Sequence, residues 1–292
     1  MNPASALTAA FVLLAAVPAF GQDWDPVKSA TGWASFDRDG SCVFLDPAAR
    51  ALRVWSRDTG TTEMLAVSRL DAPPEKWVLD PAGNAWIVTS TTLQRLEKTG
   101  KAGTSYSLPA EVADLAWDAR SFVLCYRTKE PYLERRDLKG GAVMWTYGIK
   151  PSKGGLAAQV RHRVAIREDG KVLLTSGESL RLDLLDIEKG TRTGTEDFTV
   201  KGKPLPLLAL ADGDRGGLAW WMNNNVALMA VPAYQLPPGE GKGLMLARLD
   251  LTTHDLLFLP TGADEKAVLV GILDNSAVLR GPAGGLTFVP IP

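Results

Sequence analysis

The residues best suited to chemistry lie in a basic stretch near the middle of the chain. Its members are Lys150, Lys153, Arg161, His162 and Arg163. Several cations in one connection can bind a carboxylate, sulfate or phosphate group, because guanidinium groups donate paired hydrogen bonds to such anions. The alternative is a solvated basic loop whose charges pair with nearby acids.

Two aromatic residues form a second candidate feature. Trp221 follows another Trp on an expected strand, so the two side chains point to opposite faces. Tyr234 lies in a Pro/Gly-rich insertion at residues 233–243. An aromatic platform of this kind suits a sugar, whereas the alternative is core packing, since Trp is largely buried on average.

Established catalytic and cofactor motifs are missing. No H-E-x-x-H, C-x-x-C, G-x-S-x-G or G-x-G-x-x-G pattern occurs. Residues 239–243 lack the spacer and hydroxyl residue of a phosphate loop, and residues 212–217 lack the later ligands of a calcium loop. His162 and His254 are the two histidines, so a histidine-rich metal site is excluded. We therefore predict no catalytic residue, metal or cofactor.

Composition narrows the class of protein. The 292 residues carry 32 basic and 33 acidic side chains, and 46% are hydrophobic. This hydrophobic share is typical of a folded chain. Without an overall basic excess, we expect no nucleic-acid partner.

The first residues are typical of a secretion signal. An apolar run covers residues 9–17 and ends at Pro18, and Ala19-Phe20-Gly21 is a small-x-small cleavage site. The alternative is a membrane anchor, but an apolar run of this length is shorter than the roughly 20 residues that span a bilayer. We expect a signal peptide at residues 1–21, export to the periplasm or the extracellular space, and no membrane span.

Turn signals recur along the rest of the chain. Short apolar runs alternate with Asp/Gly/Asn clusters, the pattern of strands joined by hairpins. The first hairpins of successive units are expected at residues 37–40, 80–84, 118–121, 168–171, 212–216 and 274–276. Their spacing is near the roughly 40–50 residues of a four-stranded propeller blade.

This spacing predicts an all-β protein, a single β-propeller of about six four-stranded blades over residues 22–292. Strands are clearest in the second unit, at residues 76–79, 85–89, 93–97 and 104–108. The last unit has room for three strands, so an N-terminal strand around residues 23–29 is expected to pair near residues 286–289 and close the ring. The alternative is two β-sandwiches joined near residues 150–155, but the turn pattern continues past that point unchanged.

The second unit is similar to a known repeat. Asp80-Pro-Ala-Gly-Asn-Ala-Trp86, followed by Leu93-Gln-Arg-Leu-Glu-Lys-Thr-Gly100, resembles the NHL-type repeat of six-bladed propellers. The resemblance covers about one blade and implies the fold. Relatives by fold include metal-dependent lactonases, lyases and binding scaffolds. Lactonase-like propellers hold a divalent metal in the central channel with Glu, Asn and Asp, and the innermost strands here are too apolar to supply that set.

We therefore expect an exported, monomeric, non-enzymatic propeller that binds a partner protein or a small anionic or sugar-like ligand. The alternatives are a metal-dependent hydrolase or lyase and a structural module of an envelope assembly. Connections between blades emerge on the same face as the middle hairpin of each blade. That face is expected to gather the candidate ligand-binding residues Lys150, Lys153, Arg161, His162, Arg163, Trp221 and Tyr234. Cys42 and Cys125 fall in different blades, too far apart for a disulfide.

Overall fold

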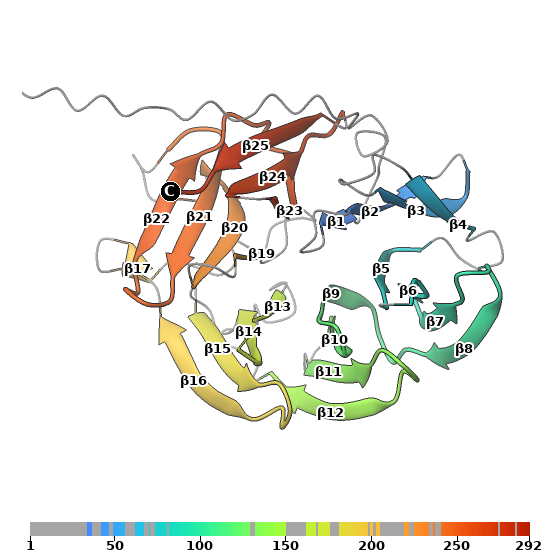
Figure 1. Ribbon diagram of the computed structural model, residues 1–292. Helices are drawn as coiled ribbons and strands as arrows, with labels where there is room; N and C mark the ends of the chain where they lie inside the picture. The colour runs from blue at the N-terminus through green and yellow to red at the C-terminus, as the bar shows by residue number, and fades with distance from the viewer. Residues whose placement is uncertain are drawn as a thin grey trace, which may run out of the picture.

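A ring of antiparallel β-sheets around a central axis makes up the computed structural model of this chain (Figure 1). The structure describes residues 34–36, 42–46, 49–55, 62–66, 70, 74–80, 82–128, 132–149, 162–167, 169–175, 181–197, 199–200, 203–204, 219–221, 225–233, 236, 241–273, 275–283 and 285–292. Within these ranges, no helix has the length and apolar character needed to cross a membrane.

Five sheets have four strands each, and in each the strands follow chain order outward from the axis (Figure 1). We number them as blades 1 to 5. Blade 1 is β1 (Ala34–Phe36), β2 (Cys42–Asp46), β3 (Ala51–Trp55) and β4 (Thr62–Ala66). Blade 2 is β5 (Lys76–Leu79), β6 (Ala85–Val88), β7 (Thr92–Leu96) and β8 (Ala102–Ser107). Blade 3 is β9 (Val112–Trp117), β10 (Ser121–Tyr126), β11 (Tyr132–Asp137) and β12 (Val143–Gly148).

The remaining strands complete the ring. Blade 4 is β13 (Val164–Ile166), β14 (Lys171–Thr175), β15 (Arg181–Asp186) and β16 (Arg192–Asp197). A short hairpin of β17 (Thr199–Val200) and β18 (Lys203–Pro204) follows. Blade 5 is β19 (Ala219–Trp221), β20 (Val226–Pro232), β21 (Leu244–Asp250) and β22 (Leu256–Pro260). A three-stranded sheet of β23 (Val268–Leu273), β24 (Ser276–Arg280) and β25 (Leu286–Pro290) lies between blades 5 and 1.

The predicted propeller with four-stranded blades is confirmed, but the blade count needs correction. The structure shows five four-stranded blades rather than six, because the last unit contributes only three strands. The N-terminal strand expected to complete that unit, at residues 23–29, lies outside the described residues, so closure by it is not shown.

Burial falls from the second strand of a blade to its outermost strand. The second strands β6, β10 and β20 are buried along their whole length, and they are rich in apolar residues. Both faces of such a strand pack against neighbouring blades, which explains their continuous apolar sequence rather than an alternating one. The outermost strands β8 and β12 are mostly exposed and more polar.

Apolar clusters join every pair of neighbouring sheets around the ring. Blades 1 and 2 share one such cluster, blades 2 and 3 another, blades 3 and 4 a third, and blades 4 and 5 a fourth. The last sheet packs against blade 5 and against blade 1, where Phe44 and Trp55 meet Val278. Among the described residues, the ring is therefore closed by face-to-face packing: the three-stranded sheet packs against blade 5 on one side and against blade 1 on the other.

The first hairpins have the turn chemistry that the sequence predicts. The Asp80 carboxylate accepts hydrogen bonds from the N–H groups of Ala82 and Asn84, at 3.0 and 2.8 Å. Gly83 takes the left-handed conformation with a φ of 81°. An aspartate that satisfies the turn's own N–H groups, followed by glycine at positive φ, fixes this hairpin locally.

A second recurring turn, not recognised from the sequence, joins the two outer strands of blades 3, 4 and 5. It reads Asp, an apolar residue, two polar or small residues, then Gly or His, at residues 137–141, 186–190 and 250–254. The fifth residue has positive φ in each case: Gly141 at 73°, Gly190 at 64° and His254 at 61°. The aspartate accepts backbone N–H bonds, as Asp186 does from Lys189 at 3.0 Å. We call these the outer turns.

Two of these turns lie against aromatic rings of the preceding blade. The indole of Trp86 donates to the carbonyl oxygen of Leu138 at 2.7 Å, and the indole of Trp145 donates to that of Ile187 at 2.6 Å. The fifth residue lies under the same ring. A Cβ at Gly190 would come within 2.5 Å of the Trp145 ring, so glycine is required there by space as well as by φ.

No disulfide joins the two cysteines, as the sequence predicts. Cys42 lies on β2 of blade 1 and Cys125 on β10 of blade 3, and both are buried thiols. A complete blade separates them, which is why a disulfide cannot form.

The outer turn of blade 4 supplies a stability prediction. Gly190→Ala adds a methyl group that overlaps Trp145 at a position of positive φ, whereas Gly100→Ala adds one at a φ of 78° with nothing within 4 Å. Gly100→Ala is expected to cost about 1–2 kcal/mol from backbone strain alone. Gly190→Ala is expected to cost about 1–3 kcal/mol more, because overpacking is added. Equal losses in urea denaturation would contradict the packing role of Gly190.

Candidate functional site

The innermost strands β1, β5, β9, β13, β19 and β23 surround the axis (Figure 1). Each blade repeats the same strand order, so the innermost strands all run the same way along the axis. We call the face on which they begin the top face. Lys76 is the first residue of β5, Asp114 lies near the start of β9, and Arg163 directly precedes β13. These three residues therefore lie at equivalent levels in three consecutive blades.

Asp114 links blades 3 and 4 at this level. Its side chain is only 2% exposed, and its carboxylate accepts a hydrogen bond from the N–H of Val164 at 2.9 Å. Val164 begins β13, so the carboxylate is held against the first residue of the neighbouring innermost strand. Cys125 is the cross-strand partner of Asp114 and packs in the apolar cluster between these two blades.

The electrostatic setting of Asp114 is unusual for a carboxylate. Burial raises the pKa of Asp114 above its usual range, although the positive charges of Arg163 and Lys76 act in the opposite direction. Burial also raises the pKa of the Cys125 thiol, and the negative charge of Asp114 adds to that effect. A carboxyl group with a raised pKa beside two cations is an arrangement that recurs at functional sites.

Two of the predicted ligand-binding residues belong to this cluster. His162 and Arg163 are buried, with 6% and 8% of their surface exposed, so they are not part of a solvated loop. Together with Lys76 and Asp114 they form what we call the axial cluster. The other predicted residues lie outside the described residues, except that Trp221 is placed on β19 without its side chain. They are Lys150, Lys153, Arg161 and Tyr234.

Sequence reasoning missed Lys76 and Asp114. The sequence places Lys76 in an innermost strand and Asp114 beside one, and these strands were expected to be too apolar to carry a site. The signal was present in β9, where Val112-Ala-Asp-Leu-Ala-Trp117 places one carboxylate in an apolar strand. Only the ring shows that this position faces Arg163, which lies 49 residues later in the chain.

His254 is an exposed turn residue, as expected, but it also contacts the preceding blade. Its Nδ1 lies 2.7 Å from the Glu196 carboxylate of β16. His254 takes the place of Gly141 and Gly190 in the outer turn of blade 5. The contact to the preceding blade is therefore made there by an imidazole and a carboxylate rather than by an aromatic ring over glycine.

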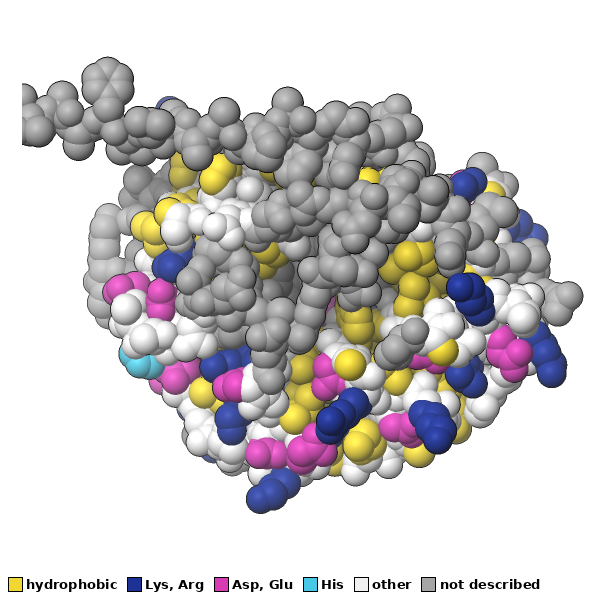
Figure 2. All heavy atoms as spheres, viewed as in Figure 1, with side chains coloured by type: hydrophobic (Ala, Val, Ile, Leu, Met, Phe, Trp, Pro, Cys, Tyr) yellow, Lys and Arg dark blue, Asp and Glu magenta, His cyan; other side chains and the backbone are white. Residues whose placement is uncertain are grey.

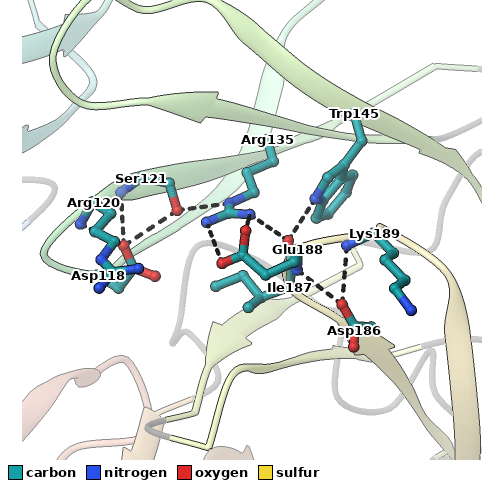
Figure 3. Close-up of polar contacts among 9 residues, drawn as sticks. All are labelled: Asp118, Arg120, Ser121, Arg135, Trp145, Asp186, Ile187, Glu188 and Lys189. Carbon is teal, nitrogen blue, oxygen red and sulfur yellow. Dashed lines mark hydrogen bonds and ion pairs between the residues drawn. The ribbon is translucent and has the colours of Figure 1, made fainter.

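A polar network between blades 3 and 4 contains the most deeply buried arginine (Figure 3). Arg135 is 1% exposed, and its guanidinium donates to the Ser121 hydroxyl at 2.8 Å and to the carbonyl oxygen of Ile187. The same guanidinium also forms an ion pair with the carboxylate of Glu188, at an N–O distance of 3.3 Å. All of these partners belong to the two packed blades, so the network has the character of an inter-blade lock.

On the face shown in Figure 2, the charged side chains of the described residues do not gather into a patch of one sign. In Figure 2, basic and acidic side chains alternate along the rim that blades 2, 3 and 4 form. Long-range attraction to one strongly charged partner is therefore not a feature of this part of the described surface.

The metal site of lactonase-like propellers does not fit the described residues at the axis. The innermost strand starts bring Lys76 and Arg163 next to Asp114, and two cations repel a divalent metal. Among the residues that the structure describes, no group of three His, Cys, Asp or Glu side chains could hold a metal ion.

Comparisons with known proteins support the fold alone. No protein-family model matches the chain, and no curated protein matches it in sequence. Virginiamycin B lyase from Staphylococcus aureus has a similar structure, with a TM-score of 0.57 and 10% identity over 89% of this chain and 80% of that one. A streptogramin B lyase matches with a TM-score of 0.55 and 13% identity over 90% and 84% of the two chains.

A third similar structure comes from a different class of protein. The Cps50 β-propeller domain of Myceliophteria thermophila matches with a TM-score of 0.53 and 13% identity over 90% of this chain and 97% of that one. Structures named as lyases and a domain named only as a propeller are thus about equally similar to this chain. The likeness establishes a β-propeller, and the site has to be argued from its own residues.

The Arg135 lock is testable by stability. Arg135→Met leaves the Ser121 hydroxyl without its buried donor, so a loss of about 1–3 kcal/mol in the free energy of unfolding is expected. Arg127→Met removes an exposed ion pair to Glu111 at 3.6 Å and is expected to cost about 0–1 kcal/mol. Urea denaturation measures both, and a loss for Arg135→Met no larger than that of the control would disprove the lock.

The raised pKa of Asp114 predicts how stability varies with pH. Its contribution is full below the ordinary aspartate pKa of about 3.9, and it is lost as the pH rises through the higher value in the folded state. Asp114→Asn keeps an acceptor for Val164 and removes the charge. The variant is therefore expected to gain stability relative to wild type as the pH rises above about 4. A difference in unfolding free energy that does not change with pH would contradict this.

Proposed function

We propose that this chain is a non-enzymatic propeller that binds a small anionic ligand at the axial cluster of Lys76, Asp114, His162 and Arg163. Sugar-like ligands that carry an acidic group belong to this class. An acidic side chain of a partner protein presents the same oxyanion and would use the same residues. Export, which rests on the apolar run and cleavage pattern of residues 1–21, forms part of the proposal.

One observation carries the proposal: charged side chains from three consecutive blades meet at a place where the innermost strands are otherwise apolar. Taking a charge out of water is costly unless the charge is paired or used. Lys76 and Arg163 bring two positive charges close enough to the Asp114 carboxylate to act on its ionisation. Cations gathered in a partly buried setting favour an anionic ligand.

The contrast with the Arg135 lock supports the same conclusion. Arg135 lies between two packed blades, and its donors meet a hydroxyl, a carbonyl oxygen and one carboxylate of those blades. The axial cluster instead lies at the starts of the innermost strands, beside the axis. The innermost strands of blades 2, 3 and 4 begin there, and the start of an innermost strand is a place where a propeller can receive a ligand.

A lyase or hydrolase is the second candidate, and one observation favours it. A carboxyl group whose pKa is raised by burial is suited to act as a general acid near neutral pH, and Asp114 is such a group. The similarity to virginiamycin B lyase is a likeness of fold and adds no residue to this candidate. Turnover of a bound ligand, abolished by Asp114→Asn with binding retained, would favour the enzyme.

The binding proposal is tested by thermal shift with glucuronate, with glucose as the uncharged control. Glucuronate is expected to raise the melting temperature of the wild type, by an amount corresponding to about 2.7 kcal/mol at a hundredfold excess over Kd. Glucose is expected to have little effect. Arg163→Gln and Lys76→Gln are expected to lose the shift, whereas Lys139→Gln, an exposed lysine on an outer turn, is expected to keep it. Equal shifts in all variants would place the site elsewhere.

A further inference from the structure

A second group of charged side chains lies on the outer part of blade 4. We call it the rim cluster, and its members on β15 and β16 are Arg181, Asp183, Arg192, Thr195 and Asp197. Arg181 and Asp183 alternate with Leu185 along β15 and so share its face. The register with β16 places the other three members on the same face. Leu185 packs in the apolar cluster that blades 3 and 4 share, so the rim cluster faces blade 3.

The two carboxylates of the rim cluster keep acceptor positions open. Asp183 is buried, and the hydrogen bond that it accepts among the described residues comes from the Thr195 hydroxyl at 3.1 Å. Two cations approach its Oδ1 at longer range, Arg181 Nε at 3.9 Å and Arg192 Nη1 at 3.7 Å. Asp197, which is 68% exposed, lies 3.7 Å from the same Nε of Arg181. All three distances exceed the range of a hydrogen bond.

The two arginines keep their donors open in the same way. Arg181 and Arg192 expose 40% and 45% of their side chains, and neither guanidinium donates a hydrogen bond to any residue that the structure describes. The buried Arg136, in contrast, donates from Nε to Glu134 at 2.6 Å and from Nη1 to the carbonyl oxygen of Gly141 at 2.8 Å. Because Arg181 and Arg192 approach the same oxygen, one small ligand can reach both. Planar guanidinium groups with open donors are suited to hold a carboxylate.

Tyr147 of β12 lies across the junction from the rim cluster. Tyr147 and Trp145 alternate along β12, and both pack against the apolar cluster between blades 3 and 4. The Trp145 indole reaches blade 4, where it donates to the carbonyl oxygen of Ile187 at 2.6 Å. Burial, and then the negative charge of Asp183, raise the pKa of the Tyr147 hydroxyl, in keeping with this placement. The half-buried ring therefore forms an apolar wall beside the charged side chains.

We infer that the rim cluster binds a free α-amino acid, whose carboxylate is held by Arg181 and Arg192. Its ammonium group lies between the carboxylates of Asp183 and Asp197, and its side chain packs against Tyr147. Two arginines balance two carboxylates here, so a simple anion or a simple cation meets repulsion from one of the pairs. An α-amino acid carries both charges on a single carbon atom, which matches cations and carboxylates 3.7–3.9 Å apart. This site is separate from the axial cluster and does not rest on the proposed function.

Calorimetry of the full chain with three related compounds tests the charge requirement. L-Phenylalanine carries both charged groups, hydrocinnamate lacks the ammonium group and phenethylamine lacks the carboxylate. L-Phenylalanine is expected to bind at least about tenfold more tightly than either analogue, because each analogue loses its charge-assisted hydrogen bonds to one half of the cluster. An analogue that binds as tightly as L-phenylalanine would show a site for one charge only and overturn the inference.

Two exposed positions locate the site without endangering the core. Arg192→Gln is expected to weaken L-phenylalanine binding about tenfold or more. Asp197→Asn is expected to weaken L-phenylalanine binding while leaving that of hydrocinnamate no weaker. Arg127→Gln is the matched control, since Arg127 is 40% exposed and lies 3.6 Å from the Glu111 carboxylate.

The outcomes are distinct from those of the axial cluster. Arg127→Gln and the axial variant Arg163→Gln are both expected to bind L-phenylalanine as the wild type does. Absence of L-phenylalanine binding by the folded wild type, or equal binding by wild type and Arg192→Gln, overturns the inference. Either result leaves the proposed function standing, because glucuronate binding is measured separately.

Discussion

The carbonyl oxygen of Ile187 is the point on which the junction of blades 3 and 4 depends. It accepts hydrogen bonds from the indole of Trp145 and the guanidinium of Arg135, both in the preceding blade. The Leu138 carbonyl receives Trp86 in the same way one blade earlier. Apolar clusters join these blades, and because apolar packing is non-directional it would by itself leave the angle between the blades loosely defined. These directional bonds fix that angle, and the positions around the axis follow from it.

The two ends of the blade 3–4 junction use charge differently. At the outer turn, Arg135 is surrounded by acceptors from the two packed blades, which makes it a fixed structural element. At the top face, Asp114 joins the innermost strands through Val164, and the positive charges of Arg163 and Lys76 act on its carboxylate. The first arrangement holds the ring together. The second places a carboxyl group and two cations at the starts of the innermost strands, where we propose that an anionic ligand binds.

The similarity to solved propellers shows how little sequence the fold demands. Identities of 10–13% accompany coverage of 89–90% of this chain. The shared requirement is a set of four-stranded sheets with apolar second strands, which many sequences meet. The aromatic residues over Gly141 and Gly190, and their replacement by the His254–Glu196 pair one blade later, are particular solutions of this chain. The candidate site is also specific to this chain, because the similar solved structures supply no residue that corresponds to it.

The sequence by itself determined the fold class and much of the blade layout, because turns such as Asp80–Asn84 are fixed by local hydrogen bonds and by glycine at positive φ. It also indicated that Cys42 and Cys125 remain apart, since strand order alone separates them. It pointed to His162 and Arg163 through the clustering of charge, but not to their burial. Lys76 and Asp114 became part of the site only in the ring. Innermost strands from three blades meet at one level there, and electrostatic contact between residues distant in the chain depends on that geometry rather than on any local pattern.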